Sequence, residues 1–183
     1  MNRVTQTALT LIIATIGGFA QASESKIIVS GDTIFISGYI GSDTKKIFSE
    51  APASAKNVDI SSAGGLVSAA EYISDIIHER HMTTIVRGYC YSACTIIFAS
   101  GAQRIAHAES SFSIHGVSIG GRGNAQAFAS TAFQINASVI NRYIEYGINP
   151  AFVREHVTYP QRMFEPAFDA YTAMNINLAT EIK

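Results

Sequence analysis

The chain has 183 residues, of which 48% are hydrophobic and 15% charged, and its formal net charge at pH 7 is −1. A chain of this length and composition can bury the core of one globular domain and is unlike a disordered segment. Its Lys and Arg residues form no basic run, which argues against nucleic acid as a partner.

The N-terminal segment has the three parts of a secretory signal peptide. Arg3 supplies a positive charge, residues 8–20 are uncharged and largely apolar, and small residues end the segment at Ala22. The apolar run is shorter than the roughly 20 residues that cross a bilayer, which favours cleavage over an uncleaved membrane anchor. We expect residues 1–22 to be removed, export to a periplasm or beyond, and one domain over residues 23–183.

Short β-rich runs and helical patterns alternate along the rest of the chain. The expected strands are residues 26–29, 33–36, 58–60, 83–86, 104–106 and 111–115, with another short strand at the C-terminus. The expected helices are residues 66–80, 93–100, 124–146, 150–157 and 167–174, and residues 42–55 form a polar-faced helix or a loop. This alternation predicts an α/β domain with a mostly parallel sheet. Gly88 is expected to turn the chain after the strand over residues 83–86.

Residues capable of chemistry lie at the ends of three expected strands or in the loops that follow them. These are Gly64-Gly65, Ser92 and His115. In an open α/β sheet, ligands bind beyond the carboxyl ends of the strands, where such loops lie. Each residue also has an ordinary structural explanation when taken alone: a glycine turn, a helix N-cap and a surface histidine.

Cys90 and Cys94 are the only cysteines, and they flank Ser92. In an oxidising compartment such a pair is expected to form a disulfide. At i,i+4 spacing in a helix the Cα atoms would lie about 6 Å apart, within the range of disulfides. The small loop would add only about 2 kcal/mol, so its main effect would be to fix the backbone around Ser92. A metal site is the weaker alternative, because no second Cys or His cluster is near.

Four motifs in register resemble the proteolytic subunit of the Clp protease, ClpP. Residues 60–65 resemble its N-S-P-G-G turn, residues 88–93 its G-x-x-x-S nucleophile turn, and residues 114–116 its I-H-Q motif. Glycines at 120, 121 and 123, followed by Asn124 and Ala125, resemble the G-G-x-x-G-Q-A pattern before its long handle helix. The resemblance extends over about residues 27–182 and is closer still to exported ClpP-like proteins with a C-x-S-A-C box.

The resemblance implies a ClpP/crotonase-like fold, with a mostly parallel sheet, flanking helices and a long handle-type helix, and serine-hydrolase chemistry without a cofactor or metal. Ser92 would be the nucleophile and His115 the base, and the backbone N–H groups of Gly65 and Ala93 would form the oxyanion hole. The substrate would be a peptide or protein. The helix over residues 124–146 corresponds to one that joins ClpP subunits and is apolar around much of its surface, which predicts a homo-oligomer. No ATPase partner is evident from the sequence.

The acid of the family's catalytic triad is missing from its expected place. An aspartate should fall within residues 160–164, but this chain has no aspartate there. Gln161, Glu165 and Asp169 are the candidates for the third member of the triad. A triad whose acid becomes an amide loses about 10⁴ in turnover through the wrong histidine tautomer. The alternative function is therefore a catalytically impaired ClpP-like module for binding or assembly.

Two other mechanisms known from related folds fit the sequence less well. A Ser-Lys dyad lacks its base, because the only lysine after Ser92 is the terminal Lys183. Crotonase-like acyl-CoA chemistry would use a similar pair of N–H groups, but CoA thioesters are not expected where the signal peptide would send the protein.

Overall fold

The computed structural model describes residues 26–117, 119, 124–158 and 167–183. Its strands are β1 (Lys26–Ser30), β2 (Thr33–Ser37), β3 (Asn57–Ser62), β4 (Thr83–Tyr91), β5 (Gln103–Ala106), β6 (Ser111–Ser113), β7 (Phe168–Asp169) and β8 (Glu181–Ile182). Its helices are α1 (Ser42–Ser49), α2 (Val67–Glu79), α3 (Ala93–Ala99), α4 (Ala125–Glu145), α5 (Pro150–Thr158) and α6 (Ala170–Asn175). The expected signal peptide, residues 1–22, lies outside the described residues.

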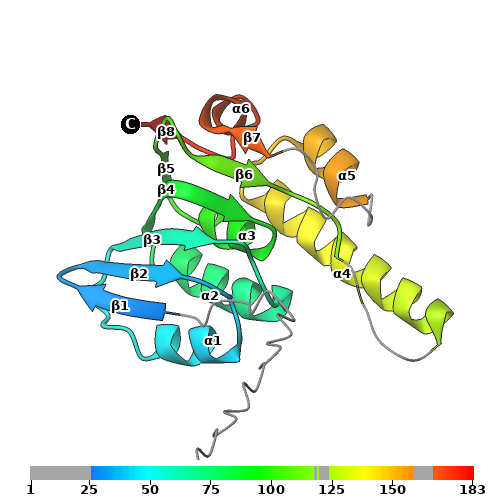
Figure 1. Cartoon of the computed structure of the whole chain (residues 1–183), viewed down its shortest axis with the longest axis horizontal. Helices are drawn as coiled ribbons and strands as arrows, with labels where there is room; N and C mark the ends of the chain where they lie inside the picture. The colour runs from blue at the N-terminus through cyan, green and yellow to red at the C-terminus, as the bar shows by residue number, and fades with distance from the viewer. Residues whose placement is uncertain (1–25, 118, 120–123, 159–166) are drawn as a thin grey trace, which may run out of the picture.

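The strands form one mixed sheet that is parallel over most of its width (Figure 1). Its order is β1-β2-β3-β4-β5-β8, with β6 beside β4 and β7 beside β6. The pairs β1–β2 and β6–β7 are antiparallel, and the other pairs are parallel. This confirms the expected α/β fold, because parallel neighbours need helical crossovers between them.

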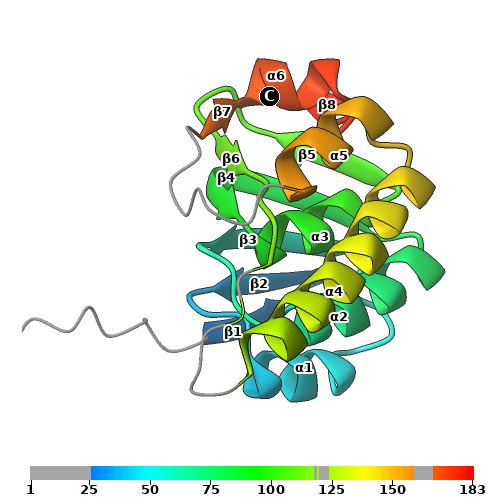
Figure 2. The same ribbon diagram turned by 90° about the vertical axis from the view of Figure 1, so that its right-hand side faces the viewer.

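Helices α1 to α4 lie on one face of the sheet, where the core forms (Figure 2). The strands supply this core by alternation: Val58 and Ile60 of β3 are fully buried, while Asn57, Asp59 and Ser61, which alternate with them, are partly exposed. Helix α3 is buried along its whole length, between the sheet and the outer helices α2 and α4. The turn before α3 is therefore anchored in the core.

Two expectations about the strands are wrong. Gly88 does not turn the chain, because β4 continues through it to Tyr91. The reason is a change of neighbour: residues before Gly88 pair with β5, and those after it pair with β6. The C-terminal helix begins at Ala170 rather than at residue 167, because Phe168 and Asp169 form the short strand β7 against β6.

Strands β3, β4 and β6 end side by side at one edge of the sheet. Ser62 at the end of β3 pairs with Cys90 of β4, and Tyr91 at the end of β4 pairs with Ser113 at the end of β6. The loops that follow these three strands therefore meet. Those loops carry Gly64-Gly65, Ser92 and His115.

The described helices are too short or too polar to cross a bilayer.

Candidate active site

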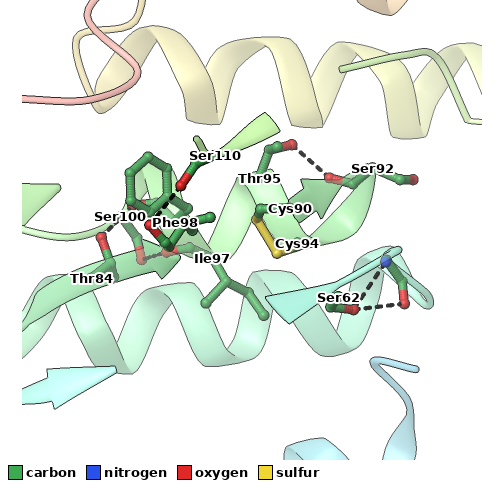
Figure 3. Close-up of a disulfide and its surroundings, with 12 residues drawn as sticks. Ser62, Thr84, Cys90, Ser92, Cys94, Thr95, Ile97, Phe98, Ser100 and Ser110 are labelled. Atoms are coloured by element: carbon green, nitrogen blue, oxygen red, sulfur yellow. Dashed lines mark hydrogen bonds between the residues drawn. A yellow bond between two sulfur atoms is a disulfide. The ribbon is translucent and has the colours of Figure 1, made fainter. Parts of the chain in front are cut away.

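Ser92 occupies a strained turn between β4 and α3. Its backbone angles are φ 55° and ψ −128°, in a region that a side chain disfavours by roughly 1–3 kcal/mol. Three bonds hold it there: the Ser92 N–H donates to the Ser113 carbonyl (2.8 Å), and the Ser92 carbonyl accepts from the Thr95 N–H (2.9 Å) and the Thr95 hydroxyl (2.6 Å) (Figure 3). A serine on a tight strand–turn–helix junction is how hydrolases present a nucleophile.

A disulfide joins Cys90 of β4 to Cys94 of α3, with the Cα atoms 5.3 Å apart. Both cysteines are fully buried, and the Ser92 side chain points away from the sulfur atoms (Figure 3). The bond thus links the residues before and after the strained turn from its buried side. It limits the ways in which the backbone at Ser92 can relax.

Gly64 and Gly65 come so close to the backbone around them that neither position has room for a side chain. Gly64 has φ +103°, and a Cβ there would lie 2.8 Å from the Cβ of Ser92. Gly65 has φ +156°, and a Cβ there would overlap the backbone of Ile40. The Gly64 carbonyl accepts the Ile40 N–H at 2.9 Å, and the Gly64 N–H donates to the Ser62 hydroxyl at 3.0 Å.

The N–H groups of Gly65 and Ala93 have no acceptor among the residues that the structure describes. Each belongs to a peptide unit whose carbonyl is already bound: that of Gly64 by Ile40, and that of Ser92 by Thr95. In a trans peptide the C=O and the N–H point in opposite directions, so anchoring the carbonyl also aims the N–H. The structure brings both expected oxyanion-hole donors to the two turns that meet at Ser92.

His115 lies two residues after Ser113, whose carbonyl accepts the Ser92 N–H. Its ring is half-buried, and its Nδ1 lies 2.8 Å from the carbonyl oxygen of Gly116. A carbonyl can only accept a hydrogen bond, so this contact requires the proton on Nδ1. The Nε2 of the neutral ring is then the nitrogen with a free lone pair, as a general base requires.

Among the residues that the structure describes, no carboxylate is hydrogen-bonded to His115. Asp169 caps helix α6, where its side chain accepts the Thr172 N–H at 2.7 Å, and this hydrogen bond lowers the pKa of the Asp169 carboxyl. Asp169 is paired with Ser111, four residues before His115. Gln161 and Glu165, the other candidates for the third member, lie outside the described residues.

Sequence reasoning missed the side chains that hold the site from helix α4. The Asn136 side-chain carbonyl accepts the Val117 N–H at 2.7 Å, and the Tyr143 hydroxyl lies 2.6 Å from that of Thr95. The only available signal was a pair of polar groups, seven residues apart, on the helix face that also carries the buried Val139. Such a pattern does not reveal which groups they bind.

No group of three or more His, Cys, Asp or Glu side chains suited to a metal ion occurs within residues 26–117, 119, 124–158 and 167–183. The loops at the three strand ends carry a hydroxyl, an imidazole and two backbone donors.

Gly64→Ala tests how closely the glycine turn packs against the nucleophile. The added methyl must displace Ser92, so we expect loss of reactivity at Ser92 and a free energy of unfolding lower by about 1–3 kcal/mol. Gly31→Ala is the matched control, because Gly31 also has positive φ (+61°) but open space around it. Urea unfolding would measure the free energy of unfolding, and labelling of Ser92 with a fluorophosphonate probe would measure its reactivity. Equal losses in the two variants would contradict the packing argument.

Comparisons with known proteins support one family. The family model described as Clp protease matches residues 21–146, which is more than half of the chain. No curated protein sequence matches the chain significantly.

Solved structures of ClpP1 from Listeria monocytogenes share the fold. One has a TM-score of 0.69 at 18% identity, with 83% of this chain and 91% of that chain covered. A mutant form of the same protein has a TM-score of 0.67 at the same identity and coverage. Since the family model spans most of the sheet and helix α4, and the fold is that of ClpP, the chain belongs to the Clp protease family.

Proposed function

We propose that the chain is a serine-type peptidase in which Ser92 is the nucleophile and His115 is the general base. Membership of the Clp protease family and the ClpP-like fold fit a serine hydrolase. The observation that supports the proposal is the meeting of three strand ends, because the loops after them carry a strained serine, an imidazole whose Nδ1 contacts a backbone carbonyl, and two N–H groups without an acceptor among the described residues.

The reaction follows from these groups. The Ser92 Oγ attacks the carbonyl carbon of a peptide bond while its proton passes to the Nε2 of His115, and the carbonyl oxygen becomes an oxyanion. The N–H groups of Gly65 and Ala93 stabilise this oxyanion. The C–N bond then breaks, and the leaving amine takes the proton from His115. Water hydrolyses the acyl group on Ser92 by the same sequence of transfers.

The contact with Gly116 bears on the alternative function, a catalytically impaired binding or assembly module. The large loss that follows removal of a triad aspartate arises from the wrong histidine tautomer. Here the Gly116 carbonyl selects the Nδ1-protonated form without a carboxylate. The missing aspartate therefore does not by itself imply an inactive site.

A fluorophosphonate probe tests the proposal, because it reacts with activated serine hydroxyls. We expect labelling of Ser92, no labelling of this position in Ser92→Ala, and a loss of about 10²–10⁴ in labelling rate in His115→Ala. Ser138→Ala and His107→Ala are controls, since both side chains bind surface groups away from the three strand ends. Peptide mass spectrometry identifies the labelled serine. Absence of labelling at Ser92 would favour the impaired module.

We propose further that the protein is exported and cleaved after Ala22. The apolar segment over residues 8–20 supports this, and so does the disulfide between Cys90 and Cys94, because disulfides persist mainly in oxidising compartments. Expression of the full chain in a bacterium with a periplasm should yield a periplasmic product. Its intact mass should equal that of residues 23–183 minus two hydrogen atoms, which are lost when the disulfide forms. A full-length, reduced product in the cytoplasm would contradict export.

A homo-oligomer is the third part of the proposal, and helix α4 is the surface that we assign to it. Phe133 in the middle of this helix is 74% exposed, a large apolar side chain that a second copy of the chain would cover. We expect sedimentation of the wild type as an oligomer and of Phe133→Glu as a smaller species. Gln134→Glu adds the same charge at the next, exposed position and should leave the assembly intact. A monomeric wild type would contradict this part.

A further inference from the structure

We propose that two side chains of helix α4, Asn136 and Tyr143, are positioning residues that hold the base and the oxyanion hole in working geometry. The inference rests on the proposed hydrolase function. Each side chain fixes one backbone peptide unit of the site. The two lie seven residues apart, so they share one face of the helix at a spacing of about 10 Å along its axis.

Tyr143 acts through Thr95. The Thr95 hydroxyl has one proton, which it donates to the Ser92 carbonyl at 2.6 Å, so the 2.6 Å contact with Tyr143 must use the phenol proton. Tyr143 and Thr95 are almost completely buried. Burial raises the pKa of the Tyr143 phenol, which keeps that proton in place.

The hydrogen bonds from Tyr143 to Thr95 and from Thr95 onward end at the peptide unit between Ser92 and Ala93. Its carbonyl receives the Thr95 hydroxyl, so its N–H, the proposed oxyanion donor, points the opposite way into the site. Hydrogen bonds in a chain also polarise one another. A bond donated by Tyr143 to Thr95 therefore strengthens the next bond to Ser92 and makes the Ala93 N–H a better donor.

Asn136 acts on the peptide unit between Gly116 and Val117. Its side-chain oxygen accepts the Val117 N–H at 2.7 Å, and the carbonyl of the same unit accepts from the Nδ1 of His115 at 2.8 Å. Because the unit is planar, holding its N–H sets the direction of its carbonyl. Asn136 thereby controls which tautomer of His115 is favoured, the task that an aspartate performs in a complete triad.

Variants that each remove one hydroxyl or amide distinguish the proposed positioning roles from a general contribution to packing. We expect Tyr143→Phe, Thr95→Val and Asn136→Ala to lower kcat for p-nitrophenyl acetate by about tenfold with KM unchanged, less than the 10²–10³ that follows loss of an oxyanion donor itself. Thr95→Ser and Asn136→Asp keep the donor or acceptor and should retain near wild-type kcat.

Two controls are matched to these variants. Tyr146→Phe removes a hydroxyl at the C-cap of the same helix, where it contacts Ser74 and Arg142. Thr84→Val removes a hydroxyl that holds the other end of α3, through the Phe98 carbonyl at 2.7 Å. Both should keep wild-type kcat. A control that loses as much as Tyr143→Phe, or test variants within twofold of wild type, would overturn the inference.

A second measurement does not depend on activity. Nitrogen-15 spectra of histidine-labelled protein report the ring tautomer, with the His115 signals identified by their loss in His115→Gln. We expect the Nδ1-protonated form in the wild type and in Asn136→Asp, and a mixture in Asn136→Ala. An unchanged His115 tautomer in Asn136→Ala would contradict the positioning role of Asn136, even if Ser92 is reactive. Hydrolysis that survives Ser92→Ala would instead refute the proposed function.

Discussion

The backbone conformation of Ser92 is the constraint on which the rest of the site depends. A serine at φ 55° and ψ −128° is unfavourable in isolation, and it persists because its surroundings over-determine it. A disulfide joins the residues on both sides of it, β6 accepts its N–H, and Thr95 binds its carbonyl. Each hydrogen bond contributes only about 1 kcal/mol, so several are needed to offset the strain.

Peptide planarity extends this constraint to the whole site. Three peptide units, those after Gly64, Ser92 and Gly116, each have one end bound by the scaffold and the other end turned toward the chemistry. The scaffold groups are the Ile40 N–H, the Thr95 hydroxyl and the Asn136 side chain. A site made largely of backbone groups is sensitive to any change that moves these three peptide planes.

Local patterns in the sequence explain which features could be predicted. Alternating strands and helices predicted the α/β fold, and the order of the expected strands predicted that Gly65, Ser92 and His115 lie near strand ends. Their catalytic roles stay predictions. Strand β7 was not predicted, since a two-residue strand exists only through its partner β6. The contacts of Tyr143 and Asn136 were not predictable either, because each joins helix α4 to a residue 19 to 48 positions earlier.

In the proposed site, a backbone carbonyl contacts His115 where a complete triad has an aspartate, and this separates two tasks that the carboxylate combines. A carboxylate selects the tautomer of the histidine, and its charge also stabilises the imidazolium that forms when the base accepts a proton. The Gly116 carbonyl can perform the first task, because it accepts from Nδ1, but it carries a dipole rather than a full charge. Orientation is therefore retained while charge stabilisation is reduced. The expected enzyme is slower than one with a complete triad, yet faster than one whose histidine adopts the wrong tautomer.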